Sequence, residues 1–412
     1  MTNYFKNSVR ASPVNTAFAR VLLSLYILWK IHSYDWLELT EWPSYLLPHY
    51  LITPPSWAVV SLGVATVALA AVIVGYRLRV SAFIAAVAVS HLGILRASSG
   101  LSGSEQSMQI AAYILVFIAL YSESDYLTID KLRQTSEKPL ADLNSHLKDH
   151  PTDDSFAHPV LKYALLLVTI LYFGSGVGKV IKGPIQAWIQ PESLARYIVA
   201  WGLKDQTQPL MGLFLNNELL LWLSTIGTLV LELGFLIAVV VGVAIWPFLL
   251  GMAAMHVVIA LSVGPFFIDQ LVFLGLFVPW DRLYSRWAHD EPLDIVYDEH
   301  CYFCNQSLHI FPYLDINDTV TFYSQYTVPE EYKDREGTDF ESAMFAFRDD
   351  KAYRGYWAFR ELLRQFTVFA PLVWLMGFPP VAAVGERVYQ YIADNRDRHF
   401  TCSVDLGEEA DD

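Results

Sequence analysis

The amino-acid sequence predicts a mainly α-helical multi-pass membrane bundle of about eight spans, followed by a C-terminal α/β domain of thioredoxin-like type. Three observations predict this architecture. The 412 residues are 54% hydrophobic and 17% charged, which is too apolar for an ordinary soluble chain. Residues 281–412 hold 12 Lys and Arg against 25 Asp and Glu, or −13 of the net charge of −14. From residue 293 onward, the long apolar runs give way to short strand-like segments.

The predicted boundaries follow this change in composition. We assign residues 1–285 to the transmembrane domain, 286–402 to the α/β domain and 403–412 to an acidic disordered tail. The acidic surface argues against nucleic acid as a partner. The first apolar run contains Arg20 and Lys30 and lacks a small-residue cleavage site, so we expect a retained span rather than a secretory signal.

Eight apolar segments are candidates for membrane spans, for which a bilayer core requires about 20 residues each. The last of them is short and rich in Phe, so it is expected to cross obliquely or only in part. The segments are 16–34, 56–75, 80–97, 107–122, 158–178, 217–240, 244–264 and 267–280.

The Lys and Arg residues of the short loops predict the orientation. They cluster in alternate loops, which places the N-terminus and the C-terminal domain on the cytoplasmic side of the cell membrane. The segment 179–216 is predicted outside although it contains basic residues, and its aromatic residues suggest that it lies on the outer membrane surface. The loop at 35–55 is similar, and the two segments either cover a cavity or only anchor the chain. Residues 123–156 are interpreted as a charged cytoplasmic connector without a chemical role.

Two ionisable residues lie in the middle of predicted spans. Glu232 belongs to GTLVLELGFLIAVV and His256 to LLGMAAMHVVIALSVG, both too far from a helix end to reach water. Because charges are costly in a bilayer, both side chains are expected to face the interior of the bundle. Either they form a structural polar pair, or they bind a ligand or handle protons.

Lys179 follows a run of small residues in LYFGSGVGKVIKGPIQAW, residues 171–188. The small residues allow helices to approach closely, which needs no further function. A lysine in a partly dehydrated pocket loses its proton readily and can serve as a base. The alternative is a lysine that extends to the lipid headgroups.

The segment YFGSGVGK followed by Trp188 resembles the corresponding motif of vitamin K-dependent gamma-glutamyl carboxylases and their bacterial relatives, the HTTM family. The stretch LELGFLIAVV and the apolar sequence after it are also similar, and the resemblance covers about residues 12–285. It implies a site that opens on the outer side, with Lys179 as the base that deprotonates a reduced quinone. Glu232, His256 and Trp188 are then expected to line the quinone site. The chain departs from the carboxylases in having Glu105 in a loop where they carry a functional histidine.

The acidic part has the element order of a thioredoxin-like domain. LDIVY (293–297) and TVTFYSQY (319–326) are predicted strands, and residues 342–355 a strand pair with a turn at Asp349-Asp350. Residues 356–366 and 385–400 are predicted amphipathic helices.

Cys301 and Cys304 lie between the first of these strands and a predicted helix, in YDEHCYFCNQ. At a helix N-terminus, backbone N–H groups and the helix dipole favour the thiolate, which is typical of a redox dithiol. A structural zinc site needs four ligands, and no second CxxC follows, so we expect no metal. An idle cysteine pair also stays open. Cys402 stands alone in the tail.

The sequence YDEHCYFCN resembles the DxxCxxC motif of the DCC family of thiol–disulfide oxidoreductases. AFRDDKAYRGYWAFRELL and VYQYIADNRDRHF are also similar, so the resemblance covers about 290–400. It implies an active site of Asp298, Cys301 and Cys304, with Glu299 where the family has glycine. Asp298 is expected to accept a proton or to cap the following helix.

These observations predict a membrane-bound thiol–disulfide oxidoreductase in which Cys301 attacks the disulfide of a protein partner and Cys304 resolves the mixed disulfide. A quinone bound in the bundle is the candidate cofactor. Two alternatives remain, a carboxylase-like enzyme that uses Lys179 as its base and a non-enzymatic binder of lipid or quinone with a redox-sensing domain.

Overall fold

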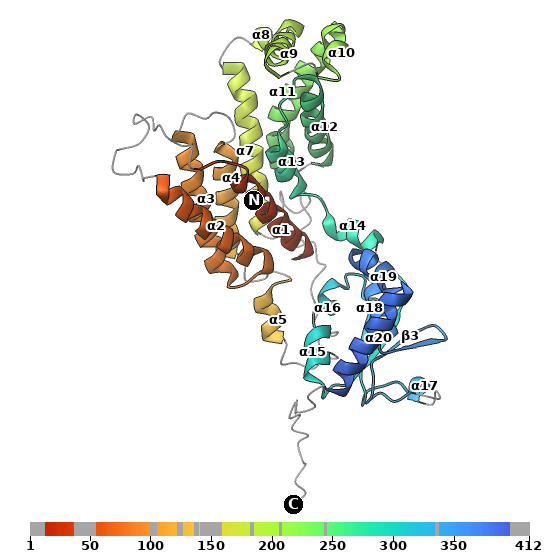
Figure 1. The fold of residues 1–412 in the computed structure, drawn as a ribbon. Helices are drawn as coiled ribbons and strands as arrows, with labels where there is room; N and C mark the ends of the chain where they lie inside the picture. Colours follow the sequence, from red (N-terminus) through yellow and green to blue (C-terminus); the bar gives the residue numbers. More distant parts are fainter. Residues whose placement is uncertain are drawn as a thin grey trace, which may run out of the picture. The chain divides into compact units, whose positions relative to one another are not determined.

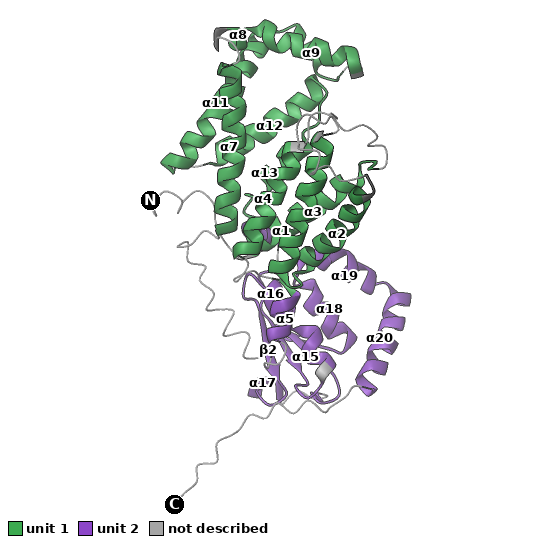
Figure 2. Cartoon of the chain, turned by 90° about the vertical axis from the view of Figure 1, so that its left-hand side faces the viewer, with its two compact units in different colours: residues 1–128, 153–279 green, residues 129–152, 280–412 purple. Residues whose placement is uncertain are grey.

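The computed structural model describes residues 13–36, 55–98, 105–121, 127–135, 140, 159–181, 185–205, 208–242, 245–287, 289–333 and 338–395. The chain forms two compact units, shown in different colours in Figure 2. The first unit comprises Met1–Thr128 and Asp153–Pro279, and the second comprises Ile129–Thr152 and Trp280–Asp412. The predicted loop at 35–55 and tail at 403–412 lie almost entirely outside the described residues.

The first unit is helical throughout its described part. Helix α3 packs between α2 and α4, and α7 contacts both α4 and α11, which joins the unit into one bundle (Figure 1). Buried Leu, Val, Ile and Ala side chains fill its core. The helices are α1 (Pro13–His32), α2 (Pro55–Val74), α3 (Leu78–Ser98), α4 (Glu105–Tyr121), α7 (Pro159–Ile181), α8 (Ile185–Ile189), α9 (Pro191–Asp205), α10 (Met211–Leu215), α11 (Glu218–Val241), α12 (Trp246–Ser262) and α13 (Ile268–Gly275).

Five helices of this unit are long and apolar enough to cross a membrane, namely α1, α2, α3, α7 and α11. Helices α4 and α12 are apolar but shorter, with 17 residues each. The eighth predicted span, 267–280, contains only the eight-residue α13. Eight residues rise about 12 Å, which is too short for a hydrocarbon core of about 30 Å. The prediction of about eight spans is therefore not confirmed, because several apolar segments form helices shorter than their composition suggested.

The second unit contains a four-stranded sheet in the order β2-β1-β3-β4, and its α/β character confirms the prediction from sequence. The strands are β1 (Leu293–Tyr297), β2 (Val320–Ser324), β3 (Phe345–Arg348) and β4 (Lys351–Arg354). Strand β1 pairs parallel with β2 and antiparallel with β3. The predicted turn between β3 and β4 is also present, and Asp349 has a positive φ of 52°.

Helices cover this sheet, and one of them differs from the prediction. The helix expected at 385–400 begins at Pro379, because two prolines fit the first turn, where N–H groups have no intrahelical partner. Residues 396–400 lie outside the described part. The helices of the unit are α5 (Ile129–Thr135), α14 (Trp280–Trp287), α15 (Tyr302–Leu308), α16 (Phe311–Leu314), α17 (Glu330–Lys333), α18 (Tyr356–Arg364), η3 (Thr367–Phe369), α19 (Ala370–Met376) and α20 (Pro379–Asp394).

Part of the predicted connector packs on the second unit. Leu140 is fully buried in the core of that unit, and its backbone N–H donates to the Tyr297 hydroxyl at 3.1 Å. The hydroxyls of Thr135 and Tyr313 are hydrogen-bonded at 3.0 Å, and burial raises the pKa of Tyr313. The connector therefore packs against Tyr297, the last residue of the strand that precedes the cysteine pair. Its charged sequence did not indicate this contact.

Candidate functional site

Cys301 and Cys304 form a disulfide where β1 leads into α15. Their Cα atoms are 5.2 Å apart. Cys301 is the N-cap of α15, with an extended backbone, and its Sγ accepts a hydrogen bond from the Cys304 N–H at 3.1 Å. A helix N-terminus carries unpaired N–H groups and a partial positive charge, so this position stabilises a thiolate on Cys301 once the disulfide opens.

The two cysteines differ in their access to solvent. Cys301 has no exposed surface, whereas Cys304 is partly exposed. A thiolate arriving from solvent therefore meets Cys304 first. The sequence showed the pair and its spacing but not this difference, which depends on how the β1–α15 turn packs.

Asp298 is buried between the ends of the two parallel strands. Its side chain is 4% exposed, and Oδ1 accepts hydrogen bonds from the His300 N–H at 3.0 Å and from Gln325 Nε2 at 3.4 Å. The N-cap of α15 is Cys301, so Asp298 does not cap that helix but holds the turn before it. The carboxylate is thus fixed three residues before the first cysteine.

Gln325 is a site residue that sequence reasoning missed. It follows β2, and its Oε1 accepts a hydrogen bond from the Glu299 N–H at 2.7 Å. The sequence contained a signal for this contact. Asp298 directly follows β1 and Gln325 directly follows β2, and the carboxyl ends of adjacent parallel strands meet at one edge of a sheet. Glu299 does not have a positive φ, so the turn accepts glutamate in place of the family's glycine without backbone strain.

Two exposed aromatic residues belong to the cysteine motif or contact it. The Tyr326 hydroxyl is 2.8 Å from His300 Nε2, and the two rings pack edge to face. Tyr326 is 63% exposed, and Phe303, between the two cysteines, is 53% exposed. Large exposed aromatic rings are typical of surfaces that bind other proteins.

No group of three or more His, Cys, Asp or Glu side chains is placed to hold a metal ion within the described ranges. Of the two histidines that flank the cysteine pair in the sequence, His309 is buried, and its ring nitrogens lie 2.5 Å from the Asn305 carbonyl oxygen and 3.1 Å from that of Thr135. His300 contacts Tyr326 instead.

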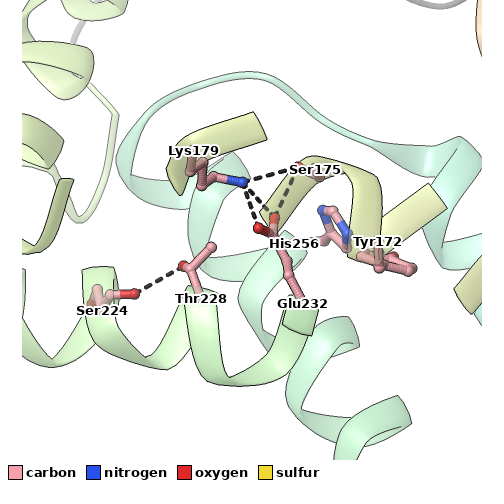
Figure 3. A network of polar contacts seen from close by, with 7 residues as sticks. All are labelled: Tyr172, Ser175, Lys179, Ser224, Thr228, Glu232 and His256. Atoms are coloured by element: carbon pink, nitrogen blue, oxygen red, sulfur yellow. Dashed lines mark hydrogen bonds and ion pairs between the residues drawn. The ribbon is translucent and has the colours of Figure 1, made fainter. Parts of the chain in front are cut away.

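A second polar cluster lies among the apolar helices of the first unit (Figure 3). Lys179 Nζ on α7 is 2.6 Å from both carboxylate oxygens of Glu232 on α11, and it also donates to Ser175 Oγ at 2.9 Å. The side chain of Glu232 is 6% exposed and that of Lys179 is 19% exposed. Lys179 thus forms an ion pair with a carboxylate instead of extending alone to headgroups.

His256 joins this cluster through a different partner from the one expected. Its Nε2 is 2.9 Å from the Tyr172 hydroxyl, and no hydrogen bond links it to Glu232 in the part of the chain that is described. Its Nδ1 is buried without a hydrogen-bond partner there. Tyr172, Ser175 and Lys179 recur every three or four residues along α7, which places them on one helix face. Sequence reasoning identified Lys179 as a site residue but missed Tyr172, which contacts His256. The spacing of Tyr172 and Lys179 along α7 was a signal that they share one helix face.

Trp188 on α8 lies beside the ion pair. Its ring centroid is 5.3 Å from Lys179 Nζ, and the ring also packs against Tyr197 of α9. A cation over an aromatic ring is attracted by the negative face of the ring. The four residues assigned to a ligand site from sequence, Lys179, Glu232, His256 and Trp188, therefore occupy one region of the first unit.

The bundle also contains a buried ion pair that the sequence did not reveal. Lys30 Nζ is 2.5 Å from Asp269 Oδ2 and donates to Ser107 Oγ at 2.6 Å. The Tyr26 hydroxyl donates to the same carboxylate. The pair connects α1 with α13 at positions that are 239 residues apart in the chain.

A family model described as DCC1-like thiol-disulfide oxidoreductase matches residues 295–402. This match covers most of the second unit and includes Asp298, Cys301 and Cys304. It leaves the apolar part of the chain outside, so the resemblance of that part to the HTTM family stays a prediction. Neither a curated protein nor a solved structure matches the chain.

Proposed function

We propose that the protein is a membrane thiol–disulfide oxidoreductase whose active groups are Cys301, Cys304 and Asp298. The observation that carries this proposal is the disulfide at the N-terminus of α15, within the segment that matches the oxidoreductase family. Five helices able to span a membrane support attachment to a bilayer. The exposed rings of Phe303 and Tyr326 support a protein as the thiol partner.

The exchange proceeds through a mixed disulfide. A thiolate of the partner attacks Cys304 Sγ, which forms the intermolecular disulfide and breaks the Cys301–Cys304 bond. Cys301 leaves as a thiolate that accepts the Cys304 N–H hydrogen bond. The second thiolate of the partner then displaces Cys304, so the partner leaves as a disulfide and the protein becomes a dithiol. Two electrons pass to the protein, and Asp298 serves as the nearby proton carrier.

This order reverses the one expected from sequence, in which Cys301 carries the mixed disulfide. The burial of Cys301 and the partial exposure of Cys304 support the revised order. Attack on a disulfide also favours the sulfur whose bonded neighbour leaves as the more stable thiolate. Attack on Cys304 releases Cys301, which is the more stable thiolate.

The test is oxidation of a fluorescent dithiol peptide to its disulfide by the purified full-length protein in its Cys301–Cys304 disulfide form. We expect Cys301→Ser and Cys304→Ser each to abolish exchange. Cys402→Ser is the matched control and should retain the wild-type rate. Exchange that persists in both active-site variants would refute the proposed function.

A second candidate function is electron exchange with a quinone bound near Lys179. An ammonium, a carboxylate, a phenol and an imidazole gather among apolar helices, where such groups usually serve a purpose. Wild-type protein extracted in mild detergent and analysed by mass spectrometry should contain a quinone that Lys179→Met and Glu232→Gln lose. If the variants retain as much quinone as the wild type, this site does not bind it.

The same cluster would serve a carboxylase-like reaction, in which Lys179 deprotonates a reduced quinone. For that role the lysine must first give up its proton, and Glu232 is the acceptor in direct contact with it. Retention of quinol-dependent activity by Lys179→Met would exclude the base role.

The cytoplasmic placement of the second unit is also a proposal, supported by the distribution of Lys and Arg. In intact cells under reducing conditions, Cys304 should not react with a membrane-impermeant maleimide, whereas it should react after permeabilisation. Labelling in intact cells would place the unit on the outer side.

A further inference from the structure

The second unit carries an apolar helical hairpin that the redox chemistry does not use. Helices η3 and α19, Thr367–Met376, meet α20, Pro379–Asp394, at a bend of 98°. Between Arg364 and Glu386 the chain has no charged residue, although the part from residue 281 onward is strongly acidic. This segment is apolar enough for a membrane helix but is bent too sharply for a single straight span.

The apolar side chains of the hairpin form two exposed stripes. Val368, Leu372 and Leu375 recur at helical spacing on one arm, and Val384, Val388 and Tyr391 recur on the other. Trp374 and Phe378 lie near the bend, and Trp374 is 77% exposed. The opposite side is buried in the core of the unit, where Val373, Met376 and Ala382 pack.

The backbone at the bend is satisfied within the protein. The last four carbonyls of α19, from Val373 to Met376, all accept hydrogen bonds. Gly377 and Phe378 donate through their backbone N–H groups, Arg360 Nε donates to Val373 at 3.1 Å, and the Tyr356 hydroxyl donates to Met376 at 3.0 Å. In the next helix, Pro379 and Pro380 have no N–H to satisfy. At a helix end in water, water molecules supply the missing hydrogen-bond partners. Lipid cannot supply them, so a helix end in lipid needs partners from the protein itself, as found here.

The base of the hairpin is hydrogen-bonded to the helix with which the longer segment of the second unit begins. The Thr367 hydroxyl donates to the Trp287 carbonyl at the end of α14. Helix α14 begins at Trp280, directly after the last residue of the apolar first unit, and its eight residues span about 12 Å. Along the chain, the residue that holds the base of the hairpin therefore follows the apolar first unit by one short helix.

We propose that the hairpin η3–α19–α20 inserts from one side into the interfacial layer of the bilayer, with Trp374 and Phe378 at its deepest part. Its arms are too short to cross the membrane, and helices of this kind lie about 5–10 Å into the boundary between headgroups and acyl chains. The charges of α20 begin at Glu386 and Arg387, so from there on the helix lies at the level of the headgroups, with Val388 and Tyr391 still on its apolar stripe. We take the occupant of the exposed apolar face to be lipid, because the stretch between Arg364 and Glu386 has no charged residue and the carbonyls at its bend find their hydrogen-bond partners within the protein. This insertion does not depend on the redox function.

The test measures lipid contact in the full-length protein reconstituted into liposomes. Trp374→Cys and Val384→Cys are each made in a background of Cys301→Ser, Cys304→Ser and Cys402→Ser, and each carries a nitroxide spin label. The control is Glu331→Cys on exposed α17, which lies at the opposite end of the unit from α19 (Figures 1 and 2). Power saturation compares collisions with oxygen, which concentrates in lipid, and with a nickel chelate, which stays in water.

We expect the labels at 374 and 384 to collide several-fold more with oxygen than with nickel, and the label at 331 to show the reverse. Predominant nickel collisions at 374 and 384 would mean that the face is in water, and would overturn the proposal. Few collisions with either reagent would mean that protein covers the face, which also overturns it. Having two independent positions keeps the test decisive if one variant does not fold, as circular dichroism will show.

Discussion

Cys304 donates its backbone N–H to the sulfur of Cys301 at 3.1 Å, while Cys301 is buried and Cys304 is partly exposed. The buried sulfur is therefore the one stabilised as a leaving group. In the reverse reaction, in which the Cys304 thiolate attacks the disulfide of a partner, we expect Cys301→Ser to accumulate a mixed disulfide on Cys304, because this variant lacks the second thiol that would displace the partner. Non-reducing electrophoresis and mass spectrometry of the trapped adduct measure this directly. If the adduct instead accumulates on Cys301 in the Cys304→Ser protein, the order inferred from sequence is correct.

The carboxylate of Asp298 has two separable roles, as acceptor for the His300 N–H and as proton carrier. Asp298→Asn keeps an acceptor oxygen but loses the charge, so we expect near-normal stability and exchange slowed about 10- to 100-fold. Asp298→Ala loses both and should also lower the free energy of unfolding by about 1 kcal/mol. Stopped-flow exchange and thermal unfolding report the two roles. A wild-type rate in Asp298→Asn would show that the residue only holds the turn.

Of the three glycines in GSGVG, Gly176 is the one that packs closely against another helix in the described part of the chain. A Cβ at Gly176 would lie 2.8 Å from Leu233 Cδ2 and 3.1 Å from the Cβ of Glu232, whereas a Cβ at Gly174 or Gly178 meets nothing within 4 Å. We expect Gly176→Ala to destabilise the bundle by about 1–3 kcal/mol through overpacking. Gly174→Ala and Gly178→Ala are the matched controls and should unfold like the wild type in detergent. Equal effects at all three positions would contradict this packing.

The Lys179–Glu232 pair should behave as a coupled unit. Glu232→Met leaves Lys179 without its carboxylate, and breaking such a pair costs about 3 kcal/mol when it is buried, less here because Lys179 is partly exposed. The double variant Lys179→Met with Glu232→Met leaves no unpaired charge, so we expect it to be more stable than Glu232→Met alone. A double-mutant cycle of thermal unfolding in detergent measures the coupling. Additive effects would mean that the two groups do not interact in the folded protein.

The docking of Leu140 on the second unit should be measurable as stability. Its side chain is fully buried in a core that includes residues of β1. We expect Leu140→Ala to lower the free energy of unfolding of this unit by about 2–4 kcal/mol through loss of burial and a cavity. Gln134→Ala on exposed α5 is the control. An unchanged transition in Leu140→Ala would show that the connector does not contribute to this core.

Much of the second unit was predictable because its signals are local. Short apolar runs separated by turn residues correctly predicted four strands, and CxxC between a strand and a helix predicted the cysteine pair at the helix N-terminus. The start of α20 was missed, because the apolar residues from Pro379 to Gly385 lack the charged face by which an amphipathic helix is recognised. The predicted number of spans is not confirmed for a similar reason, since composition gives hydrophobicity but not where a helix ends.

The sequence by itself determined the division into an apolar and an acidic part, the sheet and its cysteine pair, and the ionisable residues within the apolar segments. These features follow from the composition and from the periodicity of the apolar residues, and any folded form of the chain must accommodate both. Only the tertiary structure decided the partners. It paired Lys179 with Glu232 and Tyr172 with His256, brought Gln325 to Asp298, and buried Cys301 while leaving Cys304 partly exposed. Each of these contacts joins residues on different elements or depends on the packing around a turn, so its geometry arises only when the helices and strands pack together.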